Sequence, residues 1–331
     1  MALNVRLTSV QLIWDGKDVT RDLSRYVKEL RFTDRFASGK AQRDDIAIRL
    51  SNVDERFTGA WWPATGSQLQ PAITWQDDAG SHTWRLGTFT IDQQVLRRMP
   101  NSLTVQALSQ SLQRKALEQV QTRSWEQITL AALAQQVASE SGLTTQISDA
   151  DINLTNLQQR QESAHALLGR LAQAHHLVFA IKGTVLVLAA KPVVKTHVID
   201  WRTDVISGDI KKRDRALYAA CTIQYYDAQQ DVLLDHTESV TGVAGDRTLN
   251  LYTPATDLAN ARELAQAALA EANQAGAGQA QVVIRGAPIA AGEQINLQHA
   301  GRLSGTFVVR EAIHTLNPAW TTHLGMERQD G

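Results

Sequence analysis

Histidines are the first residues of this sequence whose type could support metal binding or catalysis. His175 and His176 are adjacent, and the other histidines are scattered, among them His82, His165, His197, His236 and His314. Neighbours on a helix point in different directions, so the adjacent pair cannot bind one ion from a shared helix face. The sequence contains neither HExxH nor a Cys/His zinc spacing. We therefore expect no metal and no cofactor, and we interpret His175 as a packed or capping residue of a helix.

Carboxylates occur in pairs at Asp44-Asp45 and Asp77-Asp78. Neighbours in a strand point to opposite faces, whereas a glycosidase needs two carboxylates facing each other across a cleft, one with a raised pKa. The sequence also lacks a GxSxG elbow, a GxxxxGK phosphate loop and a GxGxxG after a strand. These patterns predict a protein that is not an enzyme. A cell-wall-degrading enzyme remains the alternative.

Charge and cysteine content exclude other classes of protein. Lys and Arg number 33 against 34 Asp and Glu, without the basic surplus that phosphate binding requires, so we expect no specific nucleic-acid binding. Arg97-Arg98, Lys211-Lys212-Arg213 and Arg123 could line a lumen or meet a partner, or simply be solvated. The single cysteine, Cys221, is expected to be buried. No apolar run reaches ~20 residues, so we expect no membrane insertion. The start lacks the layout of a secretory signal, so we expect the protein to remain in the cytoplasm until it is assembled.

Trp61 and Trp62 are the candidate binding residues. Two adjacent tryptophans before Pro63 cannot both point inward on a strand, and exposed aromatic surface often marks an interface. Trp61 and Trp62 are therefore a possible interface. The alternative is a loop that packs both rings into the end of a β domain.

The elements that must position these residues change character along the chain. Residues 1–110 are predicted to form short strands, including 27–32, 46–50 and 103–107, and Asp15-Gly16 predicts a tight turn. The apolar alternation changes phase across Gly87, which indicates a bulge or sharp bend.

Residues 111–192 are predicted to form a helix–strand insert. Ser124 and Gln127 have capping-box spacing, and apolar residues then recur at helical spacing until Gly142. A second helix is expected to begin at Ser163. Strands are expected at 144–147 and at 178–188, the latter broken by a turn at 182–183.

Residues 193–331 return to strands, at 217–226, 232–240, 281–284 and 306–313. One helix, at about 256–275 with Thr256 as N-cap, carries a stripe of small residues and should lie flat on a sheet. The segment 27–35, ending in Asp34-Arg35, is similar to 205–215, ending in Asp214-Arg215, and each leads to a strand, at Ile46 and at Ala219. The two β regions are therefore either related or alike by chance. The fold class is α+β.

Three stretches give the sequence a resemblance to the phage late control gene D family of contractile-tail hub proteins. The first comprises residues 45–52 and the loop 61–66; the second, 161–183, is a capped helix followed by a hairpin; the third comprises 305–316 and 320–324. The sequence is similar, in turn, to the hub-like part of type VI secretion spike proteins. His175-His176 depart from the family pattern, which has an aromatic and then a small residue there.

The resemblance implies a non-enzymatic homotrimer in which each chain supplies two small antiparallel β-barrels, 1–110 and 193–331, around the 111–192 insert, with one long helix packed on the second β region. Six barrels would let a threefold spike meet a sixfold tail tube. The implied partners are the protein itself, a spike protein and the first tail-tube ring, with tape-measure and baseplate wedge proteins as further candidates. The implied location is the bacterial cytoplasm and then the baseplate of a phage or a headless bacteriocin. A DNA-binding regulator is disfavoured by the charge balance.

Overall fold

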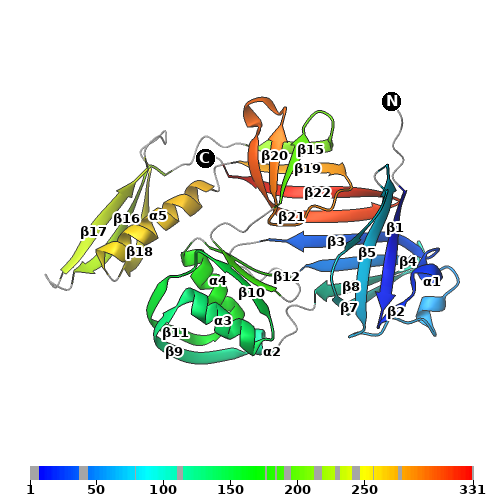
Figure 1. The fold of residues 1–331 in the computed structure, drawn as a ribbon, viewed down its shortest axis with the longest axis horizontal. Coiled ribbons are helices and arrows are strands. Elements are labelled where there is room, and N and C mark those ends of the chain that lie inside the picture. Colours follow the sequence, from blue (N-terminus) through cyan, green and yellow to red (C-terminus); the bar gives the residue numbers. More distant parts are fainter. Residues whose placement is uncertain are drawn as a thin grey trace.

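The computed structural model describes residues 7–36, 44–78, 80–109, 115–175, 177–182, 185–189, 195–211, 218–227, 232–240, 247–255, 257–274 and 278–329. These residues form mostly strands with few helices, which confirms the α+β class. Four hydrophobic cores divide them into a first lobe, a middle lobe, a second lobe and a smaller lobe around helix α5 (Figure 1).

The first lobe contains most of the strands of the N-terminal region. They are β1 (Leu7–Trp14), β2 (Lys17–Asp18), β3 (Val27–Arg35), β4 (Asp45–Ser51), β5 (Gln68–Asp77), β6 (Gly80–Arg85), β7 (Phe89–Arg97) and β8 (Ser102–Ser109), with the short helix α1 (Thr20–Leu23). Asp15 and Gly16 both have positive φ, so the predicted turn between β1 and β2 is confirmed. The phase change across Gly87 marks the break between β6 and β7.

The middle lobe has one short helix and two longer helices packed with strands. Its elements are α2 (Lys115–Glu118), β9 (Val120–Thr129), α3 (Leu130–Glu140), β10 (Thr144–Ser148), β11 (Asn153–Ser163), α4 (Ala164–Ala174), β12 (Val178–Lys182) and β13 (Val185–Ala189). The predicted capping box is wrong, because Ser124 and Gln127 lie in β9, paired with β11, and Thr129 caps α3 instead by accepting from the Ala132 N–H at 3.2 Å. Gly142, at φ 61°, ends α3 as predicted. Ser163 caps α4 as predicted.

The second lobe and the α5 lobe interleave in sequence. The second lobe contains β14 (Thr196–Asp200), β15 (Val205–Lys211), β19 (Gln279–Arg285), β20 (Gln294–Gln298), β21 (Gly305–Asn317) and β22 (Ala319–Arg328). The α5 lobe contains β16 (Ala220–Asp227), β17 (Val232–Ser239), β18 (Thr248–Ala255) and α5 (Leu258–Gln274). As predicted, the small-residue face of α5 lies on a sheet, with Ala261 and Ala265 buried against Ile223. Thr256, its predicted N-cap, lies outside the described residues.

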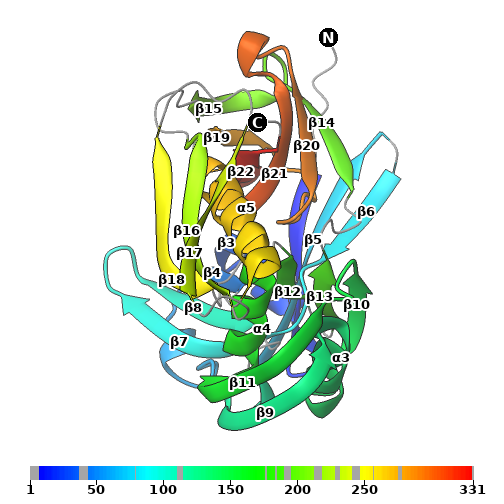
Figure 2. The same cartoon turned by 90° about the vertical axis from the view of Figure 1, so that its left-hand side faces the viewer.

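One run of hydrogen-bonded strands connects the first and second lobes. Its order is β15-β19-β22-β21-β3-β4-β8-β7, and Figure 2 shows these strands following one another from β15 at the top to β7 near the bottom. The join is made by β21, which pairs with β20 over residues 305–308 and with β3 over residues 311–316, on the same side. The lobes are therefore joined by backbone hydrogen bonds and not only by side chains.

Both lobes have the same strand order. In chain order, the first lobe uses β1, β3, β4, β5, β7 and β8, which lie in the sheet as β1-β5-β7-β8-β4-β3. The second uses β14, β15, β19, β20, β21 and β22, which lie as β14-β20-β21-β22-β19-β15. If the six strands of each lobe are numbered in chain order, both lobes have the order 1-4-5-6-3-2 across the sheet. The directions agree in all pairings except one, since β1 and β5 are antiparallel whereas β14 and β20 are parallel.

Local irregularities repeat as well. The ladder between β7 and β8 has a bulge between Ile91 and Gln93, and the ladder between β21 and β22 has one between Val309 and Glu311. The ladder between β3 and β4 shifts register after Val27, and the one between β15 and β19 shifts after Val205. Shared order and shared bulges indicate that the two lobes are copies of one unit.

A glycine with positive φ lies two residues before each of two equivalent strands, Gly66 before β5 and Gly292 before β20. Gly66 donates to the Ile91 carbonyl at 2.9 Å, and Gly292 donates to the Val309 carbonyl at 2.7 Å. Their φ angles are 89° and 94°, a region that glycine occupies without strain.

The repeat expected from the sequence is half right. The segment at 27–35 does match the segment at 205–211, because β3 and β15 are equivalent strands. The strand that follows is β19, however, and not the strand at Ala219, which begins the α5 lobe inserted between β15 and β19. Asp214 and Arg215 lie outside the described residues.

Candidate assembly surface

The loop between β4 and β5 carries the two tryptophans. It opens on Asn52, whose side-chain oxygen accepts from the Phe57 N–H at 3.0 Å and starts a 3₁₀ turn. Phe57 is fully buried, and its ring meets that of Tyr26 edge-on at 5.4 Å. The Tyr26 hydroxyl donates to the Asp54 carboxylate at 2.7 Å, and this bond lowers the pKa of Asp54. The first half of the loop is thereby fixed to the rim of the core.

Trp61 packs on this rim, with its ring centre 6.1 Å from those of both Tyr26 and Phe57 and the Arg56 guanidinium 5.3 Å above it. It remains 37% exposed, and Trp62 is 49% exposed. The loop behind them is anchored to β7, because Gln94 donates to the Pro63 carbonyl at 2.7 Å. The structure thus packs the first ring partly against the core and leaves the second open on a fixed loop. It does not bury both rings.

Other exposed apolar side chains lie at the same end of the first lobe. Val53 is 78% exposed, Leu96 51% and Met99 90%. The Asn52 N–H donates to the Asn101 carbonyl at 2.9 Å, which places Val53 beside the tip of the β7–β8 hairpin that carries Met99. We call Val53, Trp61, Trp62, Leu96 and Met99 the tryptophan surface. Exposed apolar groups gathered at one place are typical of an interaction site. The sequence predicted Trp61 and Trp62 as a possible interface but not Val53, Leu96 or Met99, which no short pattern marks.

The candidate carboxylates have structural partners. Asp45 forms an ion pair with Arg35, Asp44 accepts from the Arg35 N–H at 3.0 Å, and Arg35 also reaches Glu311 at 3.1 Å. These contacts bridge β3, β4 and β21. In the other pair, Asp77 bonds His82 at 3.0 Å, and the His82 ring stacks on Trp75 at 5.1 Å. Asp44 and Asp45 thus help to hold strands of the two lobes together through Arg35, and they do not face each other across a cleft.

His314 is the most deeply buried titratable group at the junction between the lobes. It is 0% exposed and lies among the rings of Phe32, Trp84 and Trp320. Its Nε2 lies 3.0 Å from the Ile289 carbonyl and its Nδ1 lies 3.1 Å from the Thr322 hydroxyl, so a neutral ring satisfies both nitrogens. Burial lowers the pKa of His314 to about 4, although nearby Asp34 acts in the opposite direction.

The remaining candidates are spread over the chain. His175 is the C-cap residue of α4, as predicted, and His176 lies outside the described residues. His197 bonds Glu293 at 2.7 Å, and His236 bonds Glu238 at 3.2 Å. Cys221 is fully buried, as predicted, and burial raises the pKa of its thiol. Within the described part of the chain, no three His, Cys, Asp or Glu side chains could hold a metal ion together, and no helix is long and apolar enough to cross a membrane.

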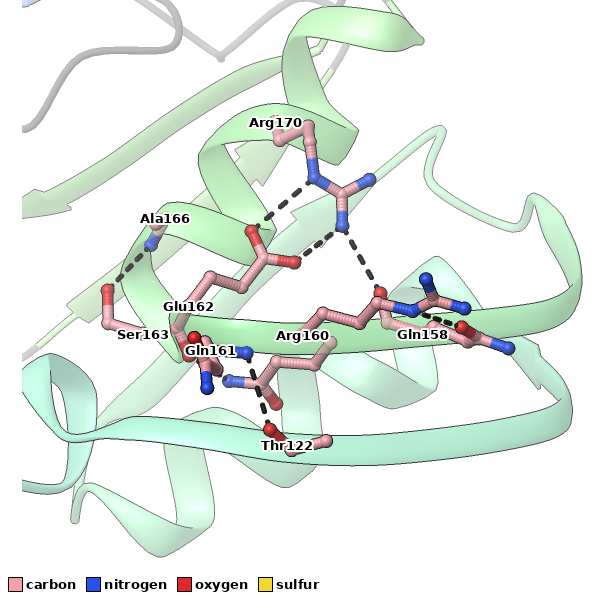
Figure 3. A network of polar contacts seen from close by, with 9 residues as sticks. Thr122, Gln158, Arg160, Gln161, Glu162, Ser163, Ala166 and Arg170 are labelled. Carbon is pink, nitrogen blue, oxygen red and sulfur yellow. Dashed lines mark hydrogen bonds and ion pairs between the residues drawn. The ribbon is translucent and has the colours of Figure 1, made fainter.

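A polar network supports the middle lobe where β11 runs into α4 (Figure 3). The Glu162 carboxylate receives the Arg170 guanidinium at 2.6 Å, and Ser163 accepts from the Ala166 N–H at 3.1 Å. Gln161, at φ 46°, donates its N–H to the Thr122 hydroxyl at 3.3 Å, where the β9–β11 ladder shifts register. Arg123, whose role was open, forms an ion pair with Glu140 at 2.9 Å. These contacts hold the helix start on the strand pair.

Comparison with known proteins relates the chain to a phage protein by sequence. No family model matches the chain. The probable baseplate hub protein of Escherichia phage 186 is 27% identical over 225 residues. The match covers 65% of this chain and 55% of that protein, so this chain spans little more than half the length of its curated relative.

Solved structures share the fold over nearly the whole chain. The tail protein from Neisseria meningitidis MC58 matches with a TM-score of 0.71 at 13% identity, covering 97% of both chains. The 43 kDa tail protein of prophage MuSo2 from Shewanella oneidensis matches with a TM-score of 0.70 at 13% identity, covering 97% of this chain and 98% of that one. A chain of the half-lidded Francisella PdpA–VgrG complex matches with a TM-score of 0.62 at 6% identity, covering 98% of this chain and 59% of that one. The resemblance to phage baseplate hub proteins is thereby confirmed, and the fold is shared with phage tail proteins and with a chain of a PdpA–VgrG complex.

Proposed function

We propose that this protein is the structural central hub of a contractile phage tail or tailocin baseplate, where it adapts a threefold spike to the sixfold tail tube. The observation that carries the proposal is the duplicated lobe: one chain holds two six-stranded units with the same strand order and the same bulges. Three copies of a chain with two equivalent units present six units around a threefold axis. The relative from phage 186, named as a probable baseplate hub protein, supports the same role.

In this proposal each unit is a small, partly open barrel. In both lobes the strands at the two ends of the order are the first and second of the six in chain order, joined directly by residues 15–26 in the first lobe and by residues 201–204 in the second. That connection brings the ends of the sheet together, as barrel closure requires. We assign 1–110 and 193–331 to the two barrel domains and 111–192 to the inserted domain, with α5 on the second β region.

The proposed partners are two further copies of the chain, a spike protein and the first tube ring, with tape-measure and wedge proteins as additional neighbours. The fold shared with a PdpA–VgrG complex chain supports the spike contact. The tryptophan surface is the proposed site of one of these contacts. We propose that the protein acts by shape and symmetry and not by catalysis, first in the bacterial cytoplasm and then in the baseplate of the particle.

Light scattering on the purified chain tests the proposal. The expected mass is three times the 36.4 kDa of one chain, and negative-stain class averages should show a ring with six similar densities. A stable single-chain particle at micromolar concentration would overturn it. A zymogram in which one carboxylate substitution abolishes wall clearing would instead favour the enzyme alternative.

A further inference from the structure

The α5 lobe is attached to the second lobe at one end of its sheet and ends in a tip at the other. At the attached end, the Asn273 side chain accepts from the Tyr218 N–H at 2.7 Å and donates to the Tyr218 carbonyl at 2.9 Å. The tip is the end where β16 stops, β17 starts and α5 begins, and in Figure 1 it lies at the outer left edge of the molecule. Among the described residues, the strands of this lobe pair only with one another. No described strand of another lobe therefore pairs at the tip.

Five large apolar side chains are exposed at this tip, and we call them the tip surface: Tyr226, Val232, Leu233, Tyr252 and Leu258. Tyr226 faces Leu233 in the ladder of β16 and β17. Both point away from α5, because the neighbouring Tyr225 packs in the core beneath the helix. Tyr252 is 92% exposed and lies where the ladder between β16 and β18 shifts register. Exposed apolar side chains gathered at one place, with two tyrosines among them, are typical of a protein interface.

The charge of the α5 lobe differs in sign from that of the rest of the chain. Residues 218–274 contain eight Asp and Glu and two Lys and Arg, whereas the remaining sequence contains 26 and 31. One of the two basic residues, Arg247, lies at the attached end, where its guanidinium is 4.6 Å from the Tyr218 ring. The near-neutral charge of the whole chain thus conceals a strongly acidic lobe.

Carboxylates lie directly beside the tip surface. Asp235 is exposed and stands two residues after Leu233, on the same face of β17. Asp257 is also exposed and precedes Leu258 at the start of α5. An apolar surface bordered by carboxylates in an acidic lobe attracts a partner of opposite charge and holds its apolar side chains.

From these observations we propose that the tip surface binds a segment of another protein that combines Lys or Arg with apolar side chains. Nucleic acids and anionic lipid surfaces have the same sign of charge as the lobe and are repelled by it. A second copy of this chain offers no matching charge, because each of its other lobes has a surplus of only one or two basic residues. The contact is separate from the tryptophan surface and does not depend on the trimer.

Fluorescence anisotropy with labelled peptides tests the proposal. One probe repeats Lys-Leu-Lys-Trp and the other repeats Glu-Leu-Glu-Trp, so the two differ in the sign of their charge and share their apolar residues. We expect the basic probe to bind the full chain and the acidic probe to show no saturable binding. Because the attraction is partly electrostatic, raising the salt concentration should weaken binding of the basic probe.

Substitutions at the tip locate the binding site. Leu233→Ser with Tyr252→Ser removes two exposed apolar side chains and leaves every carboxylate in place, and it should raise the Kd of the basic probe about tenfold. The matched control, Val198→Ser with Ile206→Ser, removes two apolar side chains of the second lobe that are also exposed, and it should leave the Kd unchanged. Asp235→Lys should raise the Kd and reduce its dependence on salt, which gives a second variant at an exposed position that no core contact requires.

Other outcomes would overturn the proposal. Equal binding of both probes, or equal weakening by the control pair, would show that the tip surface has no preference for a basic partner. Tighter binding of duplex DNA or of vesicles containing phosphatidylserine than of the basic probe would assign the tip to another class of ligand. A lower particle mass in Leu233→Ser with Tyr252→Ser, measured by light scattering, would make the tip a contact between copies of this chain. The mass of the unsubstituted chain tests the hub proposal separately, so failure of peptide binding leaves that proposal intact.

Discussion

At the scale of single residues, the two tryptophans play different parts although they are adjacent. Trp61 touches Tyr26, Phe57 and Arg56, whereas Trp62 has no aromatic or cation contact within the described chain. The first ring therefore contributes to the fold, and the second is available to a partner.

Alanine substitution should separate these roles. We expect Trp61→Ala to lower the free energy of unfolding by about 1 kcal/mol, since it removes two edge-on ring contacts. Trp62→Ala should leave the unfolding midpoint nearly unchanged and weaken self-association, measured by sedimentation velocity over a dilution series. Equal effects of the two substitutions on both measurements would show that the rings have one common role.

His314 gives the junction a predictable response to acid. Its pKa is about 4 in the folded chain, below the ordinary 6.5, because burial disfavours the charged ring. Between these two pH values the unfolded chain therefore binds more protons than the folded chain. The contribution of His314 to the free energy of unfolding should be fully present above pH 6.5 and should be lost as the pH drops towards 4. The full loss attributable to this group is about 3 kcal/mol.

Denaturant titrations between pH 4 and 7, followed by tryptophan fluorescence, measure this slope. Trp84 and Trp320 lie 4.7 and 6.2 Å from the His314 ring and report on the junction. In His314→Met the stability at neutral pH should be lower, because Ile289 and Thr322 lose their partner, but the additional slope should disappear. An unchanged slope would mean that other groups cause the acid sensitivity.

At the scale of elements, the starts of α3 and α4 each depend on one hydroxyl. Ser163 accepts from the Ala166 N–H. Ser124, which was also predicted to start a helix from its spacing to Gln127, lies in β9 and caps no helix. Ser163→Ala should cost about 1 kcal/mol and speed amide exchange in the first turn of α4. Ser124→Ala is the matched control and should change stability by less than about 0.5 kcal/mol. Equal costs would contradict the cap assignment.

Periodicity in the sequence predicted the elements whose buried faces are regular. α3, α4, α5 and strands such as β4 and β8 place apolar residues at a fixed period, and all were predicted. β9 and β11 were missed because they form a two-stranded ladder with few buried residues, so polar side chains dominate their sequence. Ser124 and Gln127 have capping-box spacing, but pairing with β11 determines the structure there.

At the scale of the whole molecule, the α5 lobe is an insertion with adjoining ends. Lys211 and Gln279 face each other in the β15–β19 ladder, and the core of the α5 lobe lies entirely within residues 218–269. Replacing residues 212–278 by Asn-Gly should give a two-residue hairpin and leave the other lobes folded. Amide exchange in β21 should be unchanged, and light scattering should show the same mass per particle, in chains, as for the intact protein. Loss of protection in β21 would show that the insertion supports the second lobe.

The duplication was accessible in the sequence only in fragments. Gly87-Thr88-Phe89 and Gly305-Thr306-Phe307 begin equivalent strands, and Gly66 and Gly292 each stand two residues before a glutamine, Gln68 and Gln294. The insertion between β15 and β19 hides the repeat, because the strand expected after β15 belongs to another lobe. The tryptophan surface was equally hard to predict in full, since Val53 and Met99 meet only through the fold.

The strand β21, paired in turn with β20 and β3, also has a consequence for how such proteins diverge. The angle between the lobes is set by peptide groups, which every sequence possesses, so side chains at the seam can be replaced without changing the curvature of the molecule. Two chains of this shape accordingly share the fold over 97% of their length at 13% identity. The dimensions of a machine built from them would be inherited through backbone geometry rather than through any preserved set of contacts.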